Sequence, residues 1–276
     1  MTATASQEAF LRAFHAEHPA VTAEAFEGGR APDGRSSYEI LCHRVAGSRR
    51  VLDLGCGDGL LLEHLARGEG RRLAGVDLSP ESLALARRRP SLSGARLEEG
   101  RAQSLPFDDD SFDACVSHMA LMLMAEVDQV AAEVARVLSP GGVLACVLGG
   151  GAVGGEAYGR FIAMLRSVVE AAPPSRRIPA LGDSRTRSRD GLDGLDGILG
   201  PAGFTATHWE TVPIDLGGSA DEVWEVVSRM YDLGPLDRAA VERLRAGFMT
   251  EAKEMAGPDG RVPCGFRIHV ATARLR

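Results

Sequence analysis

The sequence lacks a long apolar segment and any pattern of paired cysteines. Its longest apolar runs, such as Ala120 to Ala125 and Val143 to Leu148, fall far short of the about 18 residues that a membrane helix requires. No basic segment followed by an apolar core opens the chain, so no secretory signal is expected. The five cysteines include no C-x-x-C pair, which favours reduced thiols and a cytoplasmic location.

Positive charge is also scarce. The 31 Lys and Arg residues are outnumbered by 38 Asp and Glu residues, which gives a net charge of -7, and Lys253 is the only lysine. This acidic balance argues against a broad nucleic-acid surface. We therefore expect a small-molecule partner, with no nucleic acid and no membrane. The oligomeric state, monomer or homodimer, is left open by the sequence.

Metal-ligand spacings are missing as well. The chain has no H-x-x-x-H or paired-cysteine spacing of the kind that holds zinc. The adjacent carboxylates of residues 108–110 precede a strand-like segment and are typical of a solvated turn. We therefore expect no bound metal.

Glycine, in contrast, is abundant, with 33 of 276 residues against a usual share of about 7%. Between Arg49 and Gly150, short apolar strands alternate with amphipathic helices. This alternation predicts an α/β fold with a parallel, doubly wound sheet. The expected strands are residues 51–55, 73–77, 95–100, 112–118 and 143–150.

The glycines gather in the segment VLDLGCGDG, residues 51–59, where a strand leads into a turn and a helix. Glycines at 55, 57 and 59 let a ligand approach backbone N–H groups closely. Asp77 ends the next strand, about 20 residues further on, where an acidic side chain suits the ribose hydroxyls of an adenosine ligand. The turn reads G-x-G-x-G rather than G-x-G-x-x-G, which argues against a pyrophosphate ligand.

Residues 37–150 resemble the class I S-adenosylmethionine-dependent methyltransferases, in the small-molecule branch of ubiquinone-biosynthesis type. The motifs concerned are DLGCGDG, GVDLS, GRAQSLPFDDDSFDACVSH and EVARVLSPGG. The resemblance implies S-adenosyl-L-methionine as cofactor and a Rossmann-like, mostly parallel seven-stranded sheet. Its last strand, RIHVATARL, would be antiparallel. It also implies an N-terminal helical cap (1–48) and a methyltransferase domain (49–276) with lid insertions at about 151–190 and 218–264.

The same resemblance assigns residues to the cofactor. Asp53 and the turn would hold the methionine part, Asp77 the ribose and Leu78 the adenine, while Ser117 would lie beside the sulfonium. The full set of expected cofactor residues is Asp53, Gly55, Cys56, Gly57, Asp77, Leu78, Ala102, Gln103 and Ser117. Arg101 departs from the family pattern, because related sequences usually have an acidic residue there, and arginine cannot accept a hydrogen bond from adenine.

His118 is the candidate catalytic base. It ends the fourth expected strand, and the carboxyl ends of parallel strands face the active-site crevice. A hydroxyl acceptor needs a base, and histidine suits proton transfer near neutral pH. The alternative is that His118 merely closes the strand or contacts the cofactor.

These features predict methyl transfer to a small molecule, with oxygen the expected acceptor atom and nitrogen or carbon open. Two alternatives remain. One is an RNA or protein methyltransferase, which the arginines between residues 176 and 189 keep open. The other is a cofactor-dependent protein of cyclase type that does not methylate.

Overall fold

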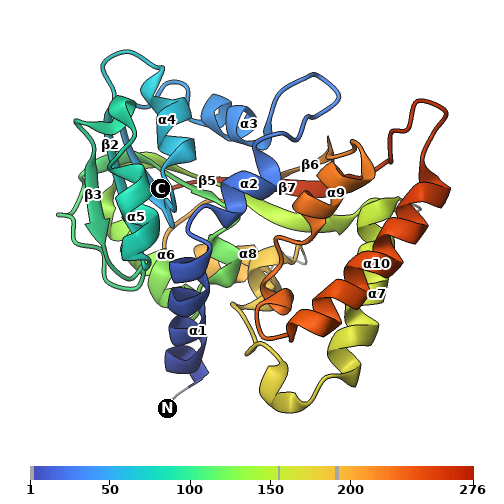
Figure 1. The fold of residues 1–276 in the computed structure, drawn as a ribbon. Helices are drawn as coiled ribbons and strands as arrows, with labels where there is room; N and C mark the ends of the chain where they lie inside the picture. Colours follow the sequence, from blue (N-terminus) through green and yellow to red (C-terminus); the bar gives the residue numbers. More distant parts are fainter. Residues whose placement is uncertain (1–2, 155, 190–192) are drawn as a thin grey trace.

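The computed structural model describes residues 3–154, 156–189 and 193–276. Its centre is a seven-stranded sheet in the order β3-β2-β1-β4-β5-β7-β6, flanked by helices (Figure 1). The strands are β1 (Arg50–Leu54), β2 (Arg72–Asp77), β3 (Arg96–Glu99), β4 (Phe112–His118), β5 (Leu138–Ala152), β6 (His208–Asp215) and β7 (Gly265–Arg274). The α/β arrangement predicted from the sequence is confirmed.

Ten labelled α-helices accompany these strands in the described part of the chain. They are α1 (Ala3–Glu17), α2 (Val21–Phe26), α3 (Ser37–Arg44), α4 (Leu60–Ala66), α5 (Pro80–Ala86), α6 (Val127–Val137), α7 (Ala157–Ala171), α8 (Leu195–Leu199), α9 (Ala220–Val227) and α10 (Arg238–Met255). Short 3-10 turns include η2 (Leu121–Leu123), η4 (Ser184–Arg187) and η6 (Tyr231–Leu233). Among the described residues, no helix combines the length and apolar character needed to cross a membrane.

Strand direction follows the expected pattern. β1 to β5 pair in parallel, whereas β7 runs antiparallel to both β5 and β6. The carboxyl ends of β1, β2 and β4 therefore lie at one edge of the sheet, where the turns of the candidate site begin.

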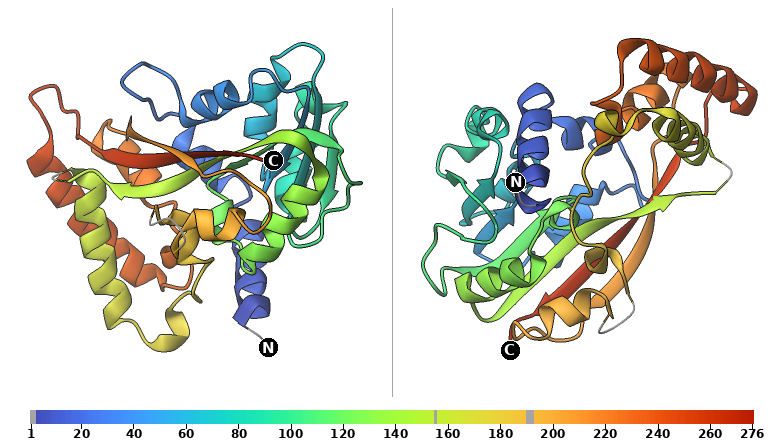
Figure 2. Two further views of the ribbon diagram at one scale, coloured as in Figure 1. Left: turned by 180° about the vertical axis from the view of Figure 1, so that it is seen from behind. Right: turned by 90° about the horizontal axis from the view of Figure 1, so that it is seen from below.

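Alternating side chains of the central strands fill two separate hydrophobic clusters. Ala114 and Val116 of β4 belong to the cluster beneath α3 and α4, whereas Cys115 faces the cluster beneath α6 and α8. This division follows from the two-residue period of a strand. The helices on the two faces of the sheet are visible in Figure 2.

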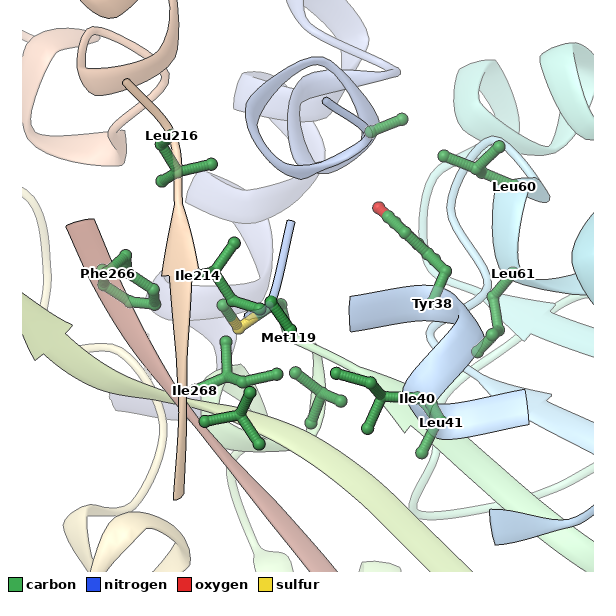
Figure 3. Packing of buried hydrophobic residues seen from close by; sticks show 14 of the residues in the cluster. Tyr38, Ile40, Leu41, Leu60, Leu61, Met119, Ile214, Leu216, Phe266 and Ile268 are labelled. Atoms are coloured by element: carbon green, nitrogen blue, oxygen red, sulfur yellow. The ribbon is translucent and has the colours of Figure 1, made fainter. Parts of the chain in front are cut away.

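The first cluster joins the N-terminal helices to the C-terminal strands. In Figure 3, Ile40 of α3 points towards Met119 and Ile268, with Ile214 beyond them, whereas the Tyr38 side chain extends away from this group. Ile40, Ile214 and Ile268 are each no more than 2% exposed. Burial of such side chains stabilises a fold by about 1.5–3 kcal/mol each, so this contact fixes α3 on the sheet.

A local sequence signal marks the start of α5. Ser79 caps α5 through the Ser82 N–H, with Pro80 in the first turn, as its residue type favours. Other boundaries differ from the expectation. The apolar spacing of residues 220–231 predicts one continuous helix, but α9 ends at Val227. Strand β5 begins at Leu138 rather than at the expected residue 143. The first five residues of β5 contain two glycines and a proline. This segment is therefore not an apolar run, and the apolar pattern predicts a later start for the strand.

The helices of the two expected insertions lie together beyond the β6 end of the sheet. α7, α9 and α10 pack through an aromatic group in which the Phe161 ring centroid is 5.7 Å from that of Phe248 and 5.9 Å from that of Trp224. Figure 1 shows α7 and α10 side by side. The domain boundaries at 48, 151–190 and 218–264 remain predictions. Residues 1–2, 155 and 190 of these segments lie outside the described residues. The sequence also predicts a short helix over residues 192–199, of which Leu192 lies outside the described residues as well.

Candidate cofactor and acceptor site

The glycine-rich turn after β1 adopts a backbone that requires glycine. Gly55, Gly57 and Gly59 have φ angles of 75°, 51° and 81°, in the left-handed region that side chains disfavour. A Cβ atom at Gly55 would lie 2.4 Å from Cβ of Ala120. The turn therefore depends on glycine for its backbone shape and for its close contact with the segment after β4.

Asp77 joins this turn to the turn after β2. Its Oδ2 accepts the Gly57 N–H at 2.8 Å, and its Oδ1 accepts the Ser79 N–H at 2.9 Å. Each carboxylate oxygen can accept a further hydrogen bond. Asp77 can therefore shape both turns and still accept from ligand hydroxyls.

Asp53 leaves an unmatched hydrogen-bond acceptor inside the site. Its side chain is 1% exposed, and its Oδ2 has no hydrogen-bond partner among the described residues. Burial raises the pKa of this carboxyl well above its ordinary value, and the nearby Asp77 and Asp58 raise it further. An unpaired buried carboxylate is costly, so Asp53 suits a ligand that brings a donor group such as an ammonium.

Two adjoining pockets open at this edge of the sheet. They share five lining residues: His15, Gly55, Asp77, Ala120 and Leu123. The first continues between α1 and the turn after β2, and the second continues towards Tyr38 and His118. Together they form one elongated site centred on Asp77 and the glycine turn.

The structure brings most of the predicted cofactor residues to these pockets. Leu78, Ala102 and Gln103 line the first pocket, Asp53, Cys56 and Gly57 line the second, and Gly55 and Asp77 line both. Ser117 lines neither pocket. Its hydroxyl donates to the Leu54 carbonyl at 2.9 Å and accepts the Leu121 N–H at 3.1 Å, so in this structure it fastens the segment after β4.

Helix α1 supplies site residues that the sequence analysis did not identify. Gln7, Glu8, Arg12 and His15 all line the first pocket. Nothing in their spacing forms a recognised ligand motif. The one sequence signal that pointed to them is the arginine at position 101, where related sequences usually have an acidic residue. Arg101 pairs with Glu8 of α1 at 2.7 Å and does not itself line the pocket.

His118 lines the second pocket but is held within the protein. Its ring stacks on Tyr38 with centroids 4.0 Å apart, and its Nε2 lies 2.8 Å from Oγ of Ser37. Its Nδ1 has no partner among the described residues. Burial, assisted by the nearby His64, lowers the pKa of His118 to about 3. The imidazole is therefore neutral at physiological pH.

The second pocket leads into a much larger cavity of about 690 Å³. Met119, Leu123 and Tyr231 line both spaces. The backbone of Met119 has a φ of 57°, an unusual conformation for a side chain of this size that is often found at functional sites. Tyr231 contacts Nε2 of His15 at 3.1 Å, so α1 and the C-terminal insertion meet where the spaces join.

The arginines between residues 176 and 189 mostly have intramolecular partners. Arg176 pairs with Asp237, Arg185 pairs with Asp128 and Asp183, and Arg189 stacks over Trp209. Arg187 instead lines the large cavity. Within the described ranges, no group of three or more acidic, histidine or cysteine side chains is arranged to hold a metal ion.

Comparison with known proteins shows what the central part of the chain resembles. Residues 52–146 match the model of a methyltransferase domain family. A fatty-acid O-methyltransferase of Mycolicibacterium smegmatis is 40% identical over 95 residues, which cover 34% of this chain and 35% of that protein. A phthiotriol/phenolphthiotriol dimycocerosates methyltransferase of Mycobacterium leprae is 36% identical over 111 residues, which cover 38% of this chain and 41% of that protein.

The chain thus spans less than half the length of these two relatives. The YcgJ protein of Bacillus subtilis matches the fold with a TM-score of 0.56 and 18% identity, covering 87% of this chain and 98% of that one. Residues 52–146 are therefore similar in sequence to a methyltransferase domain family, and they lie within a Rossmann-like α/β fold that extends over most of the chain.

The glycine turn yields a stability prediction. Gly55→Ala should lower the free energy of unfolding by at least about 2 kcal/mol, because strained φ angles and overpacking each cost about 1–3 kcal/mol. Gly34→Ala is the control, since Gly34 has a φ of 83° but open space around its Cβ position. Urea denaturation should show the larger loss for Gly55→Ala. Equal losses would mean that the contact with Ala120 is unimportant.

Burial of neutral His118 predicts an acid-dependent loss of stability. The unfolded chain gains this proton near pH 6.5, whereas the folded chain gains it only near pH 3, so stability falls as the pH drops below about 6.5. Between pH 7.5 and 5, the wild type should lose about 2 kcal/mol more than His118→Asn. Urea titrations at each pH measure this difference, and parallel curves for the two proteins would contradict it.

Proposed function

We propose that this protein binds S-adenosyl-L-methionine and transfers its methyl group to a small-molecule acceptor, with oxygen as the acceptor atom. The observation that carries the proposal is the elongated site around Asp77 and the glycine turn, within the methyltransferase domain of residues 52–146. We also propose that it belongs to the small-molecule branch of ubiquinone-biosynthesis type. Its five free thiols support a cytoplasmic setting.

The described residues fit this cofactor in chemistry and in position. Asp53 presents an unpartnered buried acceptor, which suits the ammonium of the methionine part. Asp77 retains acceptor capacity for the ribose hydroxyls, and Leu78 and Ala102 provide apolar surface beside the first pocket. The cofactor supplies a methyl group already activated by a sulfonium.

Glu8 is our candidate for the acidic residue that is missing at position 101. It lines the first pocket, and Arg101 holds its Oε1 by two hydrogen bonds of 2.9 and 2.7 Å. The second carboxylate oxygen of Glu8 remains able to accept from an adenine amino group. In this proposal the acidic contact persists, but the carboxylate comes from α1.

The protein's own contribution to methyl transfer would be alignment in a water-poor space. Orientation of two reactants can lower a barrier by about 7–11 kcal/mol. Met119, Leu123 and Tyr231 surround the junction of the second pocket with the large cavity. These side chains would position an acceptor and exclude water from the route to the methyl group.

The assignment of His118 as the base stays a prediction. Two features of the structure weigh against this role. An efficient base has a pKa near the working pH, whereas burial lowers the pKa of His118 to about 3. Its Nε2 is also engaged with Ser37. A wall of the cofactor pocket, stacked on Tyr38, is the role that these contacts support best.

The ribose assignment predicts a specific loss of cofactor affinity. Asp77→Ala should weaken S-adenosylmethionine binding about 10- to 100-fold, because hydrogen bonds to charged groups contribute about 1.5–3 kcal/mol. Isothermal titration with S-adenosylmethionine and S-adenosylhomocysteine measures this change. The control is Asp108→Ala, an exposed carboxylate that lines neither pocket. Asp77→Asn provides a milder variant if Asp77→Ala unfolds, and unchanged affinity in both would refute the assignment.

The proposed reaction predicts stoichiometric release of S-adenosylhomocysteine. Methyl-labelled cofactor should be incubated with the protein and separate fractions of small metabolites, RNA and proteins. Label should enter the small-molecule fraction, together with an equal amount of S-adenosylhomocysteine. Label in RNA or protein would mean that the acceptor is a macromolecule and not a small molecule. Conversion of a metabolite without release of S-adenosylhomocysteine would favour the cyclase-type alternative.

A further inference from the structure

The large cavity is built mainly from segments outside the methyltransferase match. Its walls come from α2, the segment after β4, the end of β5, α7, residues 178–181 and residues 229–232. Its volume of about 690 Å³ is within the range of about 300–1,000 Å³ usual for small-molecule sites. Most of the surface is apolar, with side chains that include Phe26, Met122, Ile162, Leu181, Met230 and Phe266.

Three charged residues line this apolar cavity. Arg229 is neutralised by Glu24 at 3.2 Å and Glu225 at 3.1 Å. Arg187 is exposed to solvent. Asp232 is half-buried, its carboxyl is hydrogen-bonded by its own backbone N–H, and no described residue forms an ion pair with it.

Asp232 also follows directly after Tyr231, which lines both the cavity and the second cofactor pocket. Removal from water raises the pKa of the Asp232 carboxyl. The cavity thus offers an apolar surface with one half-buried carboxylate close in the chain to its junction with the cofactor site. An ionised carboxylate accepts hydrogen bonds but cannot donate them.

We propose that the large cavity binds a neutral, mostly apolar molecule that carries a hydroxyl group, and that Asp232 accepts a hydrogen bond from this hydroxyl. The inference rests on the proposed function, in which this molecule is the methyl acceptor. The apolar walls bind its hydrocarbon part through burial of apolar surface. Its hydroxyl satisfies the half-buried carboxylate, whereas a carboxylate ligand would place two negative charges side by side.

The test compares 1-octanol with octanoate, which share a chain length and differ in the head group. Full-length protein with saturating S-adenosylhomocysteine is loaded with the fluorescent apolar probe N-phenyl-1-naphthylamine, and each ligand is titrated at pH 8. We expect both to compete, with 1-octanol at least about 10-fold tighter, equivalent to about 1.4 kcal/mol. Asp232→Asn should strengthen octanoate binding and reduce the preference to less than about 3-fold.

Asp221→Asn is the matched control, because Asp221 belongs to the same insertion, is exposed, and does not line the cavity. It should retain the wild-type preference. The proposal is overturned if neither ligand displaces the probe, if Asp232→Asn leaves the preference unchanged, or if octanoate binds as tightly as 1-octanol. Weaker octanoate binding in Arg187→Gln would then identify Arg187 as the head-group contact.

Cofactor binding is measured separately on the same protein by isothermal titration with S-adenosylhomocysteine. If the cofactor fails to bind while 1-octanol still displaces the probe in its absence, the proposed function fails and the cavity assignment stands. If the cofactor binds and the octanol preference is absent, only the inference about Asp232 fails.

Discussion

The hydrogen bonds from Gly57 and Ser79 to the Asp77 carboxylate set the geometry on which the rest of the site depends. They connect the turn after β1 to the turn after β2. The loops that follow these two neighbouring strands are therefore held in a fixed position relative to each other. Because Gly55 in the first turn lies against Ala120, the segment after β4 is placed by the same arrangement. The two adjoining pockets and the entrance to the large cavity both lie around this contact.

The central fold and this part of the site were predictable because their signals are local. Strand and helix periods and the glycine turn each occupy a short stretch of sequence, and the structure places them as expected. Position in a motif does not specify side-chain direction, however. Ser117 lies in a matching segment, yet its hydroxyl is committed to the Leu54 carbonyl and the Leu121 N–H, because a buried hydroxyl needs local partners.

The contribution of α1 was not predictable, because it depends on long-range ion pairing. Within its own motif, Arg101 is only an unexpected residue type. Its role is visible in the fold, where it forms an ion pair with Glu8 of α1. Arg12 adds a second tie, donating to the Leu78 carbonyl at 2.6 Å and pairing with Glu99. Exposed ion pairs of this kind contribute little energy singly. Their consequence here is positional, since they hold α1 over the first pocket.

The large cavity also depends on contacts between residues that are far apart in the sequence. Its lining residues come from separated parts of the chain, and an apolar run such as residues 119–124 has the same composition whether it fills a core or borders a cavity. Here Met119 belongs to the packed cluster and Met122 is only partly buried beside it, yet both border the cavity. Burial distinguishes polar residues better, because a carboxylate on an apolar wall requires a partner. Asp232 is therefore more informative about the proposed acceptor than the hydrophobic residues around it, although it forms part of no motif.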